Sequence, residues 1–144
     1  MKTMGNGEVF THTISYRVPY ADTDQMDVVY YANYLVYFER ARNELLRAYG
    51  FCYRDLEKLG MALPVREAHC VYHAPAHYDD LLEIKAWCSS FKGVRLTINC
   101  EVRRDGELLV EGYTTHVCVS TKTFRPEKPL PAFVKALGFG GDAQ

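Results

Sequence analysis

Residues 20–42 read Tyr20-Ala-Asp-Thr-Asp-Gln-Met-Asp-Val-Val-Tyr-Tyr-Ala-Asn-Tyr-Leu-Val-Tyr-Phe-Glu-Arg-Ala-Arg42 and pass from a polar loop into an amphipathic helix. The loop carries Asp22, Asp24 and Asp27 in quick succession, and loops often carry functional residues. From Asn33 to Ala48 apolar residues recur with the 3.6-residue period of a helix. We therefore expect one long helix behind a functional loop. Its expected apolar stripe is Tyr34, Leu35, Phe38, Ala41, Leu45 and Ala48.

The segments on either side of this helix alternate between apolar and polar residues, as half-buried strands do. Gly50 ends the long helix, and Asp105-Gly106 favours a tight hairpin turn between two of the later strands. The sequence therefore predicts a single α+β domain over residues 1–144, with the helix covering an antiparallel sheet. The expected strands are Val9–Val18, Leu63–Tyr72, Leu82–Phe91, Val94–Arg103 and Glu107–Thr121, and the expected short helices are Tyr53–Leu59 and Ala132–Leu137.

The composition is that of an ordinary soluble domain, with 48% hydrophobic and 24% charged residues in a chain of 144. A net charge of -1 argues against a nucleic-acid partner, because binding to phosphates needs a basic excess. Residues 1–7 lack the apolar core of a targeting signal, and no apolar run could cross a membrane. Five scattered cysteines without a CxxC pair fit a reducing compartment, so we expect a cytoplasmic protein. Cys88, Cys100 and Cys118 lie in expected strands and should be buried.

The stretch over residues 20–42 resembles the signature of the hot-dog thioesterases of the YbgC and 4-hydroxybenzoyl-CoA type. The order of predicted elements and the Tyr78-Asp79-Asp80 segment before a strand also match. This resemblance implies a curved antiparallel five-stranded sheet wrapped around a long central helix, paired into homodimers or homotetramers. It also implies hydrolysis of an acyl-CoA, short-chain aliphatic or aromatic, without a cofactor or a metal ion.

The resemblance assigns catalysis to Asp24, the second aspartate of the D-x-D element, as nucleophile or as general base. It assigns polarisation of the thioester carbonyl to the backbone N–H of Tyr31, near the start of the helix. Elementary chemistry agrees, because amides of a first helical turn lack internal partners and carry the positive end of the helix dipole. A purely turn-capping Asp24 is the alternative. Asp22 is expected to be structural.

Four further residues are expected to bind substrate. Asp27 and Tyr30 lie in the same loop, and relatives often carry glycine where Asp27 stands. Position 31 is histidine in the YbgC branch and tyrosine in the hydroxybenzoyl branch, so both departures bear on the substrate. Lys92 and Arg95 flank a turn where similar enzymes hold the nucleotide of coenzyme A, although an exposed polar turn is the alternative.

Other chemistries fit the sequence less well. Glu39 is a reserve catalyst, because some hot-dog enzymes take their carboxylate from the helix. His69, His73 and His77 have the spacing of helical metal ligands, but Pro75 makes a helix there implausible. The loop lacks the glycine of a calcium loop, and no G-x-S-x-G elbow or P-loop occurs. A non-catalytic acyl-CoA sensor is the rival function, although few residues precede the first expected strand to link it to an output domain.

Overall fold

The computed structural model describes residues 10–140, so Val9 of the first expected strand lies outside the described residues. The helical segments are η1 (Tyr20–Asp22, a 3-10 turn), α1 (Asn33–Ala48), α2 (Tyr53–Lys58) and α3 (Pro131–Ala136). The strands are β1 (Thr11–Arg17), β2 (Met61–Ala62), β3 (Val65–Tyr72), β4 (Leu81–Lys92), β5 (Arg95–Arg104), β6 (Glu107–Val117) and β7 (Val119–Ser120). All three predicted helices form, within one residue of their expected ends.

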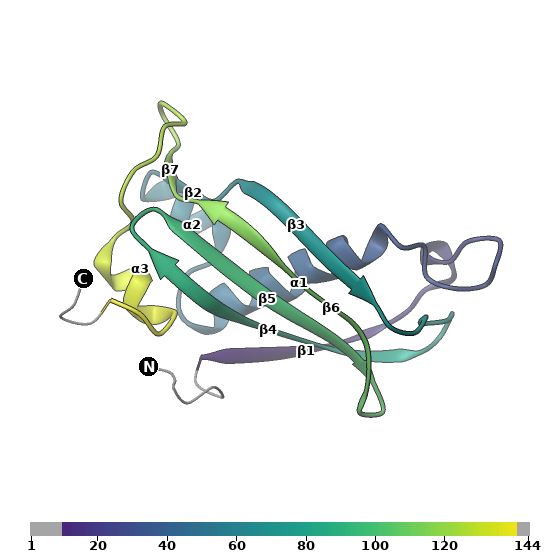
Figure 1. Ribbon diagram of the computed structural model, residues 1–144. Helices are drawn as coiled ribbons and strands as arrows, with labels where there is room; N and C mark the ends of the chain where they lie inside the picture. The colour runs from purple at the N-terminus through teal and green to yellow at the C-terminus, as the bar shows by residue number, and fades with distance from the viewer. Residues whose placement is uncertain (1–9, 141–144) are drawn as a thin grey trace.

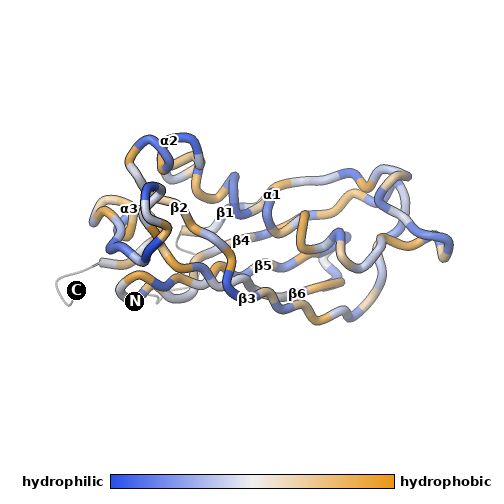
Figure 2. Tube along the Cα trace, turned by 90° about the horizontal axis from the view of Figure 1, so that it is seen from above, coloured by the Kyte–Doolittle hydropathy of each residue, from blue (hydrophilic) through white to orange (hydrophobic). Residues whose placement is uncertain are grey.

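Five strands form one antiparallel sheet in the order β1-β4-β5-β6-β3, and α1 lies along one face of it (Figures 1 and 2). Asp105 and Gly106 join β5 to β6 with φ angles of 51° and 84°, the positive values that the Asp-Gly signal predicts. This arrangement confirms the predicted α+β fold, a long helix wrapped by a five-stranded sheet.

Three predicted strands are shorter than expected, and the first of them, β1, lacks Phe10 and Val18. Pro64 has no N–H to donate to a ladder, and β3 begins only at Val65. At the other end, β6 stops before Cys118, whose N–H donates to the carbonyl of Val94 at 2.7 Å. The residues beyond these two breaks, β2 and β7, pair with each other in a separate two-stranded sheet.

The buried side of α1 differs from the expected stripe at five positions, because Tyr37, Arg42 and Leu46 are also buried whereas Leu35 and Ala48 are not. Leu35 is 40% exposed and Ala48 is exposed, so neither belongs to the core. Arg42, expected in solvent, is only 6% exposed and donates to Thr114 Oγ1 of β6 at 3.3 Å. Tyr37 and Arg42 lie on opposite edges of the apolar stripe, and because both are buried, a wider arc of α1 is covered than the stripe predicts.

The cysteines behave as predicted. All five are free, and Cys88, Cys100 and Cys118 are buried in the core. Burial raises the pKa of the Cys88 and Cys100 thiols to about 12, so both stay protonated at neutral pH. Within residues 10–140, no helix is long and apolar enough to span a membrane.

Candidate active site

The loop before α1 is held by hydrogen bonds within itself and by one to the segment before β4. The Asp24 N–H donates to the Val28 carbonyl at 2.9 Å, and the Asp27 N–H donates to the Asp24 carbonyl at 3.0 Å. The Val29 N–H donates at 2.9 Å to the carbonyl of Ala76, in the segment that leads into β4. Asp27 completes the turn with a φ of 65°, a conformation that aspartate tolerates better than most residues. The position of Asp24 is therefore set by backbone pairing.

One carboxylate oxygen of Asp24 caps the turn, and the other remains available for chemistry. Its Oδ1 accepts the Met26 N–H at 2.8 Å, so the turn-capping role considered from the sequence is real. Within the described part of the chain, this amide is the one hydrogen-bond donor to the carboxylate, and the side chain is partly exposed. The second oxygen, Oδ2, is therefore free to meet a substrate or a water molecule.

The entrance of α1 presents two unused amides. The Tyr30 carbonyl accepts the Asn33 N–H at 2.9 Å, and the Tyr31 carbonyl accepts the Tyr34 N–H at 3.4 Å. Among residues 10–140, the N–H groups of Tyr31 and Ala32 have no acceptor. These amides lie at the positive end of the helix dipole, where a developing negative charge is stabilised.

Asp22 is a structural residue, as expected. It accepts hydrogen bonds from more parts of the fold than a turn aspartate does. Its Oδ2 accepts the hydroxyl of Tyr16 at 2.8 Å and that of Tyr37 at 2.7 Å. Its carbonyl accepts Asn33 Nδ2 and the Tyr30 N–H, each at 2.9 Å. Burial, together with the bond to Asp22, raises the pKa of Tyr37 far above its ordinary value. Asp22 thus ties β1, the loop and α1 together.

A tyrosine-lined pocket of about 270 Å³ lies beside the first turn of α1. Tyr30, just outside it, has its ring 4.9 Å from that of Tyr31, and it is partly exposed. The hydrogen bond with Tyr31 raises the pKa of Tyr30, and the negative charge of Asp24 adds to this rise. Tyr30 thus contacts the ring of Tyr31 and feels the charge of Asp24. The pocket is lined by Val29, Tyr31, Tyr34, Tyr72, His73, Ala74 and Pro75.

No local pattern in the sequence points to Tyr72. It ends β3 and lies 41 residues beyond Tyr31 in the chain, yet its hydroxyl donates to the Tyr31 carbonyl at 3.2 Å. The contact arises because the end of β3 packs beside the start of α1, with the Tyr72 ring 5.6 Å from that of Tyr34. Asp27 and Glu39 are both exposed, and neither lines the pocket.

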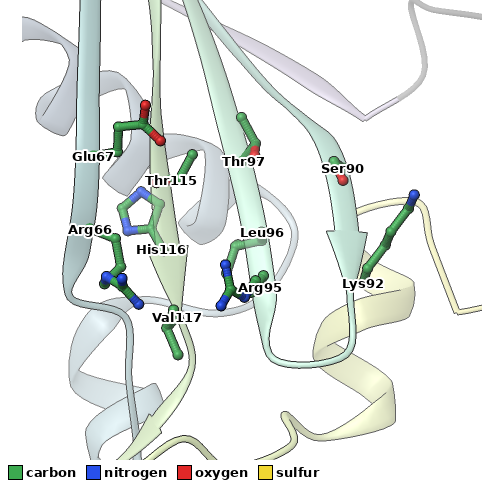
Figure 3. A pocket seen from close by; sticks show the side chains of 10 residues that line it. All are labelled: Arg66, Glu67, Ser90, Lys92, Arg95, Leu96, Thr97, Thr115, His116 and Val117. Atoms are coloured by element: carbon green, nitrogen blue, oxygen red, sulfur yellow. The ribbon is translucent and has the colours of Figure 1, made fainter.

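Lys92 and Arg95 face each other across the β4–β5 turn and line a second pocket, of about 430 Å³ (Figure 3). The structure adds Arg66 of β3 to them, a residue that the sequence did not single out. This pocket lies at the far end of the sheet from the Asp24 loop, because β4 starts beside that loop and ends at Lys92 (Figure 1). One protomer therefore does not bring the cations to Asp24.

The three spaced histidines do not gather. His69 stacks on Tyr113, His73 Nε2 lies 2.8 Å from a Glu111 carboxylate oxygen, and His77 lies beside Asp80. In the described range 10–140, no three His, Cys, Asp or Glu side chains are grouped as metal ligands would be.

Comparison with known families matches residues 18–137 to the thioesterase-like superfamily. The chain belongs to this superfamily. The acyl-CoA thioester hydrolase YbgC of Escherichia coli O6:H1 is 38% identical over 121 residues, which are 83% of this chain and 90% of that protein. The acyl-CoA thioesterase YbgC of Haemophilus influenzae is 36% identical over 121 residues, covering 83% of this chain and 88% of that one.

Among solved structures, the DHNA-CoA thioesterase of Staphylococcus aureus superposes with a TM-score of 0.83 at 30% identity. The match covers 88% of this thioesterase-like chain and 87% of that protein. The predicted family and the hot-dog fold are confirmed, and the chain is a thioester hydrolase.

Proposed function

We propose that this thioesterase hydrolyses acyl-CoA, with Asp24 as the reacting carboxylate and the Tyr31 and Ala32 amides as the oxyanion donors. The observation that carries the proposal is a carboxylate oxygen that has no partner among residues 10–140, in the loop that leads directly to two amides that have no acceptor in the same range. Relatives that are 36–38% identical and carry the name of acyl-CoA hydrolases support coenzyme A as the thiol component.

Asp24 can act by two routes that share one requirement. As nucleophile, its free oxygen attacks the thioester carbonyl carbon, the C–S bond breaks, the thiolate leaves, and water then hydrolyses the resulting anhydride. As general base, it accepts a proton from the water that attacks the same carbon. Both routes place negative charge on the carbonyl oxygen, which the Tyr31 and Ala32 N–H groups are positioned to stabilise.

The tyrosine-lined pocket favours a small acyl group. Its volume of about 270 Å³ suits a short aliphatic or an aromatic acid better than a long chain. The rings of Tyr31, Tyr34 and Tyr72 offer edges and faces on which an aromatic acyl group can stack.

We also propose that two copies of the chain complete the site. Seven of the eight residues of β3 are exposed, and β3 forms one edge of the sheet. Its outer backbone N–H and C=O groups can therefore pair with a strand of another chain. Two β3 strands paired antiparallel about a twofold axis place the start of one beside the end of the other. Arg66, Lys92 and Arg95 of one copy then approach the Tyr72 end of the other. These cations would hold the phosphates of coenzyme A there.

The rival function is an acyl-CoA sensor without turnover. The test is release of free thiol from acetyl-CoA, longer acyl-CoAs and benzoyl-CoA by the purified protein. Turnover of acetyl-CoA or benzoyl-CoA is expected, with slower turnover of long chains. Saturable binding without thiol release from any of them would favour the sensor. A cytoplasmic location stays a prediction.

A further inference from the structure

We propose that Tyr72 is a positioning residue, whose hydroxyl holds the Tyr31–Ala32 peptide so that the Ala32 N–H is presented to the thioester oxygen. This inference rests on the proposed function, because it assigns a task within the oxyanion site. It also adds a residue of β3, the strand at the sheet edge, to a site otherwise built from the loop and α1.

The contact on which the proposal depends is a single hydrogen bond. Tyr72 Oη donates to the Tyr31 carbonyl oxygen at 3.2 Å, whereas the Tyr34 N–H reaches the same oxygen only at 3.4 Å. The helical bond at this position is therefore long, and the tyrosine supplies the shorter of the two restraints. Ring contacts of Tyr72 with Tyr31 and Tyr34, at centroid distances of 6.3 and 5.6 Å, hold the phenol in place.

The carbonyl of Tyr31 and the N–H of Ala32 belong to one planar peptide unit. A hydrogen bond to the carbonyl fixes the orientation of that plane and polarises the unit, which makes its N–H a stronger donor. Because the Ala32 N–H has no acceptor among residues 10–140, the added strength is available to a substrate. Partial burial, together with a hydrogen bond to Cys70, raises the pKa of Tyr72 to about 12, so the phenol stays protonated at neutral pH.

Other tyrosines of this region have different tasks. The Tyr34 hydroxyl accepts the Ala76 N–H at 3.1 Å and so holds the segment before β4. The Tyr16 and Tyr37 hydroxyls are both bonded to Asp22. Only Tyr72 reaches a carbonyl whose peptide partner is one of the free amides at the start of α1.

The chain offers a matched control at the other end of α1. Tyr49 Oη donates to the Thr11 carbonyl at 3.0 Å, so Tyr49→Phe removes the same kind of bond far from the loop. Tyr72→Phe and Tyr49→Phe should lower the melting temperature by similar small amounts. Tyr72→Phe alone should lower kcat about tenfold with acetyl-CoA or benzoyl-CoA, while KM changes less than twofold. The reason is that the Ala32 N–H, which Tyr72 orients, interacts most strongly with the oxyanion of the transition state.

A readout that needs no turnover separates this inference from the proposed function. In a ¹H–¹⁵N spectrum of the free protein, Tyr72→Phe should shift the Ala32 amide upfield, and Tyr49→Phe should leave it in place. An unshifted Ala32 amide in Tyr72→Phe would overturn the inference, whether or not the protein cleaves acyl-CoA. A rise in KM with unchanged kcat would also overturn it, because the hydroxyl would then bind the ground state of the substrate.

Discussion

The hydroxyl of Tyr37 donates to the Asp22 carboxylate at 2.7 Å and so joins the middle of α1 to the loop that carries Asp24 two residues later. The hydroxyl of Tyr16 on β1 donates to the same oxygen at 2.8 Å. One carboxylate therefore connects a strand, the loop and the helix. The position of Asp24, the proposed reacting group, depends on this structural aspartate as well as on the turn that Asp24 caps.

Asp22→Ala should destabilise the protein by about 3 kcal/mol, because it leaves two partly buried tyrosine hydroxyls without the charged acceptor that they now share. Urea unfolding measures the change. Glu83→Ala, at an exposed position on β4, is the control and should change stability by less than about 0.5 kcal/mol. Equal stability of the two variants would show that the Asp22 contacts contribute nothing.

His116 makes stability depend on pH. Burial, with a contribution from the nearby Arg42 cation, lowers the pKa of His116 to about 4, whereas an unfolded histidine titrates near 6.5. Between these values the unfolded chain binds the extra proton, so stability is complete above about pH 6.5 and falls as the pH drops towards 4. The loss should reach roughly 3 kcal/mol in unfolding experiments at low pH.

The matched variant for this prediction is His116→Gln. Glutamine can still bond to Thr114 and to the Leu63 carbonyl, the two partners of the imidazole, but it does not titrate. The variant should lose much of the pH dependence between 4 and 6.5. Asp80, whose bonds to His77 and Arg104 lower its pKa despite partial burial, acts below this window and should not mask the effect. An unchanged slope would assign the pH dependence to other groups.

The exposed edge strand predicts a self-associated protein. Light or X-ray scattering at micromolar concentration should give at least twice the chain mass of 16.5 kDa. Val71→Lys adds a charge to an exposed position of β3 and should weaken the pairing. Leu59→Lys, at an exposed position just after α2, should not. A wild-type protein that scatters as a monomer would contradict the proposed pairing.

The cations of the second pocket should act on the nucleotide of the substrate. Arg66→Ala and Arg95→Ala should each raise KM for acyl-CoA several-fold and leave kcat nearly unchanged. With the N-acetylcysteamine thioester of the same acid, which lacks the nucleotide, neither variant should differ from wild type. Lys85→Ala, on β4 with its ammonium over the Trp87 ring, is the control. Equal losses with both substrates would assign these residues to folding rather than to phosphate binding.

Much of the fold could be predicted because the spacing of apolar residues and the turn residues depend only on nearby positions in the chain. The 3.6-residue repeat located α1, and Asp105-Gly106 located a hairpin, since each depends on a few neighbouring residues. The burial of Arg42 could not be predicted in this way. It follows from the curl of the sheet, which brings Thr114 beside a helix position that pattern alone assigns to solvent.

The candidate site also contains some residues that could be predicted from the sequence and others that could not. Asp24 and Tyr31 stand in one continuous motif, so sequence could nominate both. Tyr72 and Arg66 join their sites through strand pairing, at separations in the chain that no short motif spans. The distance between Lys92 and Asp24 within one protomer is likewise a property of the assembled sheet.

The measurement that tests the central claim most directly is the turnover of acetyl-CoA and benzoyl-CoA by Asp24→Asn. Asparagine keeps a side-chain oxygen for the Met26 N–H, so the turn and the melting temperature should be preserved. Loss of the charged carboxylate should lower kcat by about 100-fold or more. A folded Asp24→Asn protein that releases thiol at the wild-type rate would contradict the account.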